Sequence, residues 1–252
     1  MEYFVEKNSI VRKIWGKSDT VLFIFAGAAA EFALSKAVDW LYFTGRLPTD
    51  PLGRLFSTVT YARKIIFSEN EKALKTIDSI YDIHTVVERN RGNAIPDWAY
   101  RDVLYMLIHY TIASYEVLQK KLTAEEREDI YDVFYRFGKR MKIKALAANF
   151  ESWTVQRNED LKNDLEKSKY TVDLFKQYKK HLGSVRYFIL IEGQKLIVPE
   201  RVRKLLGFNK ISVLSFVLPF YRLSKIINVD RLIKDLFLPA KYKKEIYQLD
   251  IE

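Results

Sequence analysis

Apolar residues recur at helical spacing along most of the chain. The clearest example surrounds the stretch SIYDIHTVVERN, where Ala73, Ile77, Ile80, His84 and Val87 follow one another at alternating steps of four and three. Steps of this size place side chains on one face of an α-helix. The pattern therefore predicts a helix whose core-facing stripe carries a histidine.

Capping signals and chain breakers divide the pattern into further helices. Asp50 followed by Pro51 is a typical helix start, and the segments SENE (Ser68–Glu71) and Thr123…Glu126 have the form of capping boxes. The predicted helices cover about residues 19–43, 52–67, 68–88, 98–121, 124–140, 151–168, 171–182, 184–196, 199–206, 211–225 and 229–237. YFILIE (Tyr187–Glu192) is strand-like in composition but has no partner strand. The predicted fold class is all-α.

The composition favours a single domain. The chain has 252 residues, of which 48% are hydrophobic, and these suffice for a substantial core. No linker rich in Pro, Gly or Ser divides the sequence. We predict one multi-helix domain over residues 1–252, with a core at about 19–208 and basic C-terminal helices at 209–252.

The net charge of +10 is unevenly distributed. Residues 199–244 hold eleven Lys and Arg against three acids, interleaved with Leu, Ile, Val and Phe. This mixture suits an anionic membrane surface better than a nucleic-acid groove, and no nucleic-acid motif is present. A helical hairpin with a solvated basic face remains the alternative, and no nucleic-acid partner is expected.

One apolar run resembles an export signal. Thr20–Ala30 follows several basic residues, but it is shorter than the roughly 20 residues of a membrane-spanning helix. Asp19 adjoins it, and the periodic pattern continues to Phe43. We therefore predict a cytoplasmic protein, with peripheral association at a membrane as a further option.

Several common chemistries lack their sequence motifs. The chain has no cysteine, which excludes disulfides, thiolate ligands and cysteine nucleophiles. It contains no GxSxG, GxGxxG, Walker or HExxH motif. The di-iron Glu-x-x-His pair is absent too, since Tyr81, Met106 and Tyr178 stand three residues before the three histidines.

Two buried-looking histidines remain, His84 and His109, on neighbouring predicted helices. A lone histidine on an apolar stripe is more often a core residue with satisfied nitrogens. A haem iron, however, needs one neutral imidazole on a rigid helix and polar groups near the propionates. His84 offers the first, and Arg54 with Thr58 offers the second. The residues alone leave both interpretations open.

Four segments in order resemble the oxygenase family that contains latex clearing protein and the oxygenase of mycophenolic acid biosynthesis. A later segment, VPERVRKLLGF, resembles that family's Pro-x-x-x-Arg-x-x-x-Gly element, so the likeness spans roughly residues 20–208. The four segments are VLFIFAGAAAEFAL, Arg54-x-x-x-Thr58 within DPLGRLFSTVTYA, His84-x-x-Val87 followed by Trp98-Ala99-Tyr100-Arg101-Asp102, and MLIHYTIASYEVL with His109.

The resemblance implies a helical bundle that encloses a pocket for one haem b. His84 would be the iron ligand, and Arg54 and Thr58 would be catalytic residues of the haem pocket. His109 would lie near the cofactor, more plausibly as a structural residue. The family implies a haem-dependent oxygenase that acts with dioxygen on an apolar, isoprenoid- or lipid-like small molecule.

Two positions qualify this expectation. Latex clearing proteins carry a lysine just before the threonine, whereas this chain has Ser57, which is too short to reach the iron. Glu31 lies in an apolar stretch and is a candidate base for an allylic proton; its alternatives are to point outward or to pair with Lys36.

The rival function is a non-catalytic haem- or lipid-binding helical protein that docks on membranes through its basic C-terminal region.

Overall fold

The computed structural model describes residues 2–45 and 49–226, and their regular structure is helical. The predicted all-α fold is confirmed. The predicted helix at 229–237 lies outside the described residues. The helices are α1 (Ile10–Trp15), α2 (Ser18–Phe32), α3 (Asp39–Phe43), α5 (Pro51–Ile66), α6 (Asn70–Arg91), α7 (Asp97–Leu118), α8 (Ala124–Arg140), α9 (Phe150–Asn163), α10 (Lys169–Ile197), α11 (Glu200–Leu206) and α12 (Leu214–Ile226).

α7 lies at the centre of the bundle, as its nearly continuous apolar surface predicts. Tyr105, Ile108 and Tyr110 on this helix are fully buried. α2 packs against α7 at Gly27, where an added Cβ would overlap the Tyr110 ring. Gly27, within the segment VLFIFAGAAAEFAL, therefore sets how closely α2 and α7 approach each other.

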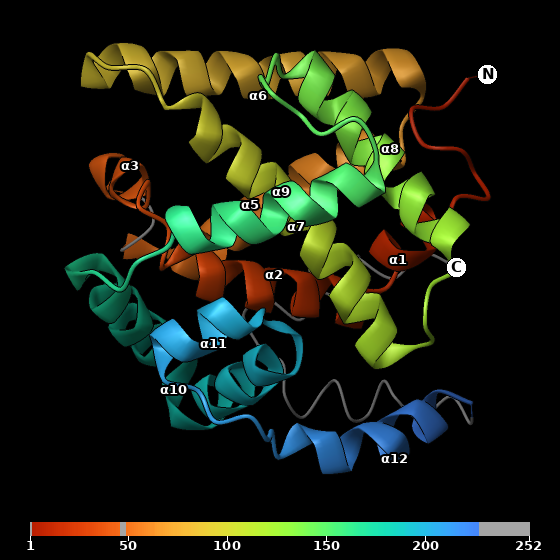
Figure 1. Cartoon of the computed structure of the whole chain (residues 1–252), viewed down its shortest axis with the longest axis vertical. Helices are drawn as coiled ribbons and strands as arrows, with labels where there is room; N and C mark the ends of the chain where they lie inside the picture. Colours follow the sequence, from red (N-terminus) through yellow and green to blue (C-terminus); the bar gives the residue numbers. More distant parts are fainter. Residues whose placement is uncertain (1, 46–48, 227–252) are drawn as a thin grey trace.

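The remaining helices surround this pair. Figure 1 shows α6 along one edge of the molecule and α12 along the opposite edge, with α2 and α7 between them. α5 packs on α6, and α10 packs on α2. No helix among the described residues is long and apolar enough to cross a bilayer.

The prediction of one continuous helix to Phe43 is wrong. α2 ends at Phe32, and α3 begins only at Asp39. The Ser35 hydroxyl accepts a hydrogen bond from the Ala37 amide, which competes with helix continuation. The neighbouring backbone pairs instead with the segment after α9, through Lys36 N–H to Asp164 O and Glu166 N–H to Leu34 O.

One predicted capping box is confirmed and the other is wrong. At the start of α8, the Thr123 hydroxyl accepts from the Glu126 amide, and the Glu126 carboxylate accepts from the Thr123 amide. At the start of α6, Glu69 occupies the cap position without a side-chain cap. Its backbone pairs with Tyr3, so a contact with the N-terminal segment takes the place of the local cap.

The predicted break between residues 182 and 184 is a sharp bend within α10. Gly183 has φ 73° and ψ 170°, a conformation that glycine adopts readily. The two halves of α10 consequently run in different directions (Figure 1). The strand-like YFILIE stretch is helical and belongs to the second half.

Candidate functional site

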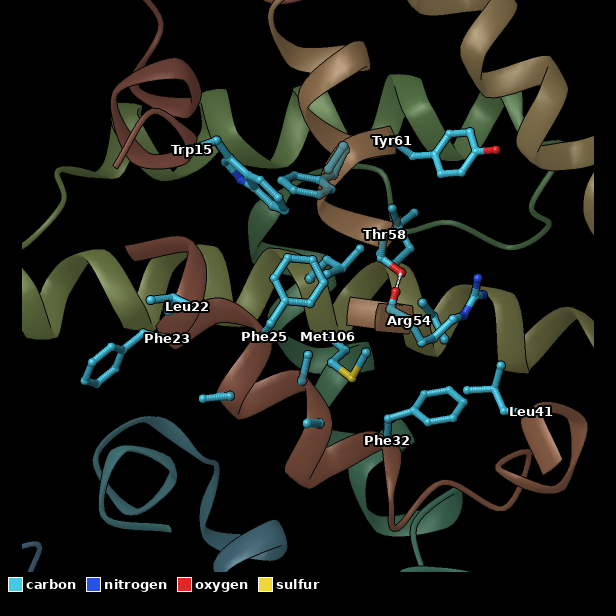
Figure 2. A pocket seen from close by; sticks show the side chains of 18 of the residues that line it. Trp15, Leu22, Phe23, Phe25, Phe32, Leu41, Arg54, Thr58, Tyr61 and Met106 are labelled. Carbon is cyan, nitrogen blue, oxygen red and sulfur yellow. Dashed lines mark hydrogen bonds between the residues drawn. The ribbon is translucent and has the colours of Figure 1, made fainter. Parts of the chain in front are cut away.

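A cavity of about 730 Å³ extends through the bundle from α6 to α12, which lie at opposite edges of the molecule in Figure 1. This volume lies in the range of cofactor and ligand pockets. Its lining is mostly apolar, and Figure 2 shows the rings of Phe25 and Phe32 on α2 rising toward α5. The polar or charged side chains on the lining include Asp19, Arg54, Thr58, Tyr61, His84, Tyr100, Arg186 and Tyr221.

His84 lines this cavity from α6, half-buried. Its Nδ1 lies 2.8 Å from the Ile80 carbonyl oxygen, four residues earlier on the same helix. Because a carbonyl only accepts, Nδ1 carries the proton of the neutral ring, and Nε2 keeps its lone pair. Metal-binding histidines commonly have this arrangement, with one nitrogen donating to the backbone and the other free to coordinate.

The charge state of His84 also suits coordination. Burial lowers the pKa of His84, and the nearby Arg54 charge lowers it further, against the opposing effect of the Ile80 hydrogen bond. The ring is therefore neutral at pH 7. A neutral imidazole is the form that binds iron.

Tyr100 on α7 fixes the orientation of the His84 ring. The two rings meet edge to face, with centroids 5.4 Å apart. The Tyr100 hydroxyl donates to Glu88 Oε1 at 3.1 Å, and the same oxygen accepts the Ile95 amide at 2.8 Å. One carboxylate thus ties α6 to the start of α7 beside the histidine.

Arg54 and Thr58, which the resemblance to the oxygenase family singles out, both lie on the cavity lining. Figure 2 shows them one turn apart on α5, where the Thr58 hydroxyl donates to the Arg54 carbonyl oxygen at 3.1 Å. Ser57, by contrast, is exposed on the outer side of α5. The distal lysine position of the latex clearing proteins therefore holds a short side chain that faces away from the cavity.

Arg186 is a second cation on the lining, which the sequence did not single out. It occupies the second half of α10, one turn before Leu190, which also lines the cavity. Its Nε is buried, and no hydrogen-bond partner reaches it within the described part of the chain. A buried donor without a partner is costly, so this position fits a negatively charged or polar group of a bound molecule.

Glu31 is buried on α2, away from the cavity lining. Its Oε1 pairs with Arg157 Nη2 at 2.5 Å, and its Oε2 accepts the Tyr110 hydroxyl at 3.0 Å. Neither alternative from the sequence is correct, because Lys36 donates to the Asn163 carbonyl instead. Both carboxylate oxygens have partners from distant parts of the chain.

His109 lies next to this ion pair and does not appear among the described cavity-lining residues. Its Nε2 is 3.4 Å from the Ile197 carbonyl oxygen, and its ring packs edge to face on Tyr110. Burial, followed by the Arg157 charge, lowers the pKa of His109 to about 4. The side chain is therefore neutral at pH 7 and connects α7 to the end of α10.

An acidic cluster of Asp102, Asp160 and Asp164 lies in the same part of the bundle. We call this cluster, together with Glu31, His109, Tyr110 and Arg157, the buried polar region. Burial, reinforced by Asp160 and Asp164, raises the pKa of Asp102 to about 8, so Asp102 is protonated at pH 7. Arg101 pairs with Asp160 at 3.3 Å. The neutral acid and the neighbouring guanidinium group account for the charge here without a metal ion.

The structure thus divides the predicted site residues into two places. His84, Arg54 and Thr58 line the cavity, whereas Glu31 and His109 belong to the buried polar region. Sequence reasoning missed Arg186, although a cation on an otherwise apolar stripe is the same kind of signal that drew attention to His84.

Comparison with known proteins gave one match. Residues 12–214 match the model of a protein family described as "ER-bound oxygenase mpaB/B'/Rubber oxygenase, catalytic domain". Neither the curated proteins nor the solved structures include a significant match. The matched range contains the α6 and α5 residues of the cavity and ends at the first residue of α12.

Proposed function

The chain belongs to the ER-bound oxygenase mpaB/B'/rubber oxygenase family, and from this premise we propose that it is a haem b-dependent oxygenase. Its co-substrate would be dioxygen, and its substrate an apolar molecule of isoprenoid or lipid type. The main support is His84, whose Nδ1 is bonded to the Ile80 carbonyl while its Nε2 remains available on the lining of a 730 Å³ apolar cavity.

The residues present fit haem b. His84 Nε2 would bind the iron, and the apolar lining would cover the porphyrin faces. The propionates need cations, and the lining supplies Arg54 and the Arg186 guanidinium with its unpaired Nε. Tyr100 would hold the His84 ring in place through its edge-to-face contact.

When bound, the haem supplies an iron that binds and activates dioxygen. The chain's own contribution is to exclude water with the aromatic and aliphatic lining and to keep His84 neutral. The Thr58 hydroxyl, held by the Arg54 carbonyl, and the Arg54 charge add polarity on α5. Ser57 is exposed and is not among the described lining residues, so it would not contact a bound haem.

Glu31 enters the proposal as a structural anchor. Its two oxygens are bonded to Arg157 and Tyr110, and it is not among the described lining residues. A role as the base for an allylic proton stays a prediction from the sequence. Glu31→Gln separates the two roles. If Glu31 is structural, the variant should unfold at a lower denaturant concentration and keep its turnover per folded molecule. If Glu31 is the base, the variant should stay folded and lose turnover.

An absorption spectrum of the purified protein tests the proposal. Wild-type protein, as isolated or after titration with hemin, should show a Soret band that shifts on reduction, and His84→Ala should bind hemin at least tenfold more weakly. His109→Ala is the matched control and should retain the band. If the wild-type protein does not bind hemin, or if His84→Ala binds hemin with unchanged affinity, the proposed haem site is refuted.

A second function has one observation in its favour. Large apolar side chains are exposed around α12, which suits a protein that carries haem or lipid and docks on membranes without catalysis. Oxygen uptake separates the two functions. Haem-loaded protein that consumes no oxygen with isoprenoid or unsaturated-lipid probes would favour the carrier, and uptake that depends on His84 would favour the enzyme.

The proposed location is the cytoplasm, with a part of the protein at the membrane periphery. The exposed apolar side chains around α12 support a contact of this kind.

A further inference from the structure

α12 is apolar on two opposite faces. Leu214, Leu218 and Tyr221 follow helical spacing and line the cavity. Phe216 and Phe220, on the other side, are 71% and 73% exposed. A surface helix of a soluble protein normally has a polar outer face, so the outer side of α12 is unusual.

The exposed apolar side chains extend beyond the helix itself. We call Ile211, Val213, Phe216, Phe220 and Leu223 the outer patch; each is more than half exposed. Together with Val217 they make up six of the fourteen large hydrophobic side chains that are exposed in the described chain. Such a concentration within 13 residues indicates a binding surface rather than scattered exposure.

Basic residues accompany the outer patch. Lys210 precedes it and Arg222 lies within its range, and both are exposed. Residues 199–226 contribute a formal charge of +5, from six basic residues and one acidic residue. Apolar side chains beside basic ones are the composition of helices that lie in the interface of an anionic bilayer. Charge complementarity therefore favours anionic lipid over a protein partner.

α12 is held to the body largely by polar contacts near its ends. At its start, the Glu192 carboxylate accepts the Val213 amide at 2.6 Å, and the Ser212 hydroxyl donates to the Glu192 carbonyl oxygen at 2.8 Å. Farther along, the Tyr221 hydroxyl donates to Asp19 Oδ2 at 2.9 Å, and Arg222 donates to the Val117 carbonyl. Between these contacts the helix covers the cavity.

We propose that the outer patch inserts into the anionic leaflet of a membrane, and that α12 is the entrance through which a lipid-soluble substrate passes from the bilayer into the cavity. Which molecule enters the cavity rests on the proposed function. The docking of the outer patch on a membrane does not depend on it. All of α12 after Leu214 lies beyond the residues that match the family. Phe216, Phe220 and Leu223 of the outer patch are therefore outside the family match, whereas Ile211 and Val213 are inside it.

Vesicle flotation tests the docking. The full chain should float with vesicles of phosphatidylcholine and phosphatidylserine and much less with phosphatidylcholine alone. The double variant F216S/F220S should lose at least about tenfold in binding, because two aromatic side chains no longer enter the bilayer. The control V155S/V172S removes two exposed apolar side chains from α9 and the first half of α10 and should bind as the wild type does.

Three results would overturn the docking. One is absence of wild-type flotation; another is flotation that F216S/F220S leaves unchanged. The third is a concentration-dependent dimer, seen by analytical ultracentrifugation, that F216S/F220S abolishes, since a second copy would then cover the outer patch. The altered side chains are exposed, so the variant should keep the wild-type melting curve.

A ligand of the iron tests the entrance. Haem-loaded protein is mixed with anionic vesicles that contain 1-dodecylimidazole, and ligation is followed by the Soret shift. F216S/F220S should slow this reaction at least about tenfold while leaving the reaction with water-soluble imidazole unchanged. Equal rates for the two proteins would refute the entrance. Protein that floats but binds no haem would refute the proposed function and leave the docking intact.

Discussion

The cavity and the buried polar region each contain a helix histidine, His84 and His109, yet they differ in how the polar groups around that histidine are paired. Around His84 the lining is apolar, one ring nitrogen is available, and the Arg186 Nε has no partner among the described residues. Around His109, Glu31 has a partner for each oxygen. The buried polar region also has atoms without a described partner, such as Arg157 Nε, but Arg157 and Glu31 pair with each other there, whereas Arg186 faces the cavity. Polar groups that face a cavity indicate a place for a ligand, and charges paired inside the bundle indicate structure.

The comparison predicts that changes in the polar region alter stability more than haem binding. The largest effect should come from Arg157→Ala, which leaves the Glu31 carboxylate buried without its cation and should cost about 3–5 kcal/mol of unfolding free energy. Chemical denaturation of the variant measures this. Arg140→Ala, which breaks an exposed pair with Asp78, should cost far less, because water solvates both charges when they separate. If Arg157→Ala keeps the stability of the wild type but loses haem binding, the polar region is part of the binding site and the comparison is wrong.

Gly27→Ala tests the packing on which the polar region depends. The added methyl group would overlap the Tyr110 ring, which cannot swing away freely because its hydroxyl is bonded to Glu31. Overpacking of this kind should cost about 1–3 kcal/mol. Thermal melting provides the measurement, and Gly193→Ala on α10 is the control, because its Cβ would meet Phe23 only at ordinary contact distance. Equal melting temperatures for the two variants would contradict the close packing of α2 on α7.

The pH dependence of stability should depend on Asp102. Its folded pKa of about 8 lies above the ordinary 3.8, so its contribution to stability falls as the pH rises through that interval. The folded pKa of His109, about 4, lies below the ordinary 6.5, so its contribution rises between those values and opposes Asp102. Between pH 6.5 and 8 the change at Asp102 exceeds the remaining opposite change at His109 and His84, and stability should fall by about 1 kcal/mol.

Asp102→Asn, a neutral side chain of the same shape, should remove this fall. Urea unfolding at pH 6.5 and at pH 8 compares the variant with the wild type. The charged groups around Asp102 are Asp160, Asp164, Arg157 and Arg101, and all four remain in the variant. A wild-type stability that stays level between the two pH values would show that Asp102 is ionised in the folded protein.

The smallest predicted effect belongs to the cavity. Tyr100→Leu removes the ring that packs against His84 and should weaken haem binding about fivefold, in keeping with an aromatic contact of about 1 kcal/mol. Tyr100→Phe keeps the ring and loses only the bond to Glu88, so it should bind haem more nearly as the wild type does. Hemin titration measures both. An unchanged Tyr100→Leu would show that the ring does not position the histidine.

Local periodicity was sufficient to predict most of the helices and to place His84 on an inward face, because helical geometry fixes which residues share a side. Arg54 and Thr58 were found through the resemblance to the oxygenase family, and both line the cavity. It was not sufficient for the partners of Glu31. Arg157 lies 126 residues away along the chain, and no local pattern links the two positions. The same limit explains the wrong boundaries at Ser35 and Ser68, where backbone pairing with distant segments replaced local capping.

The bend at Gly183 has a consequence for engineering the size of the bound molecule. Leu182 and Arg186 lie on either side of one left-handed backbone position and both face the cavity. The bend at this single residue therefore lets side chains from both halves of α10 line the cavity. A residue with a side chain at position 183 would destabilise the protein, because its backbone rarely adopts this positive φ. Changes at Leu182 would alter the size of the cavity and leave the bend in place.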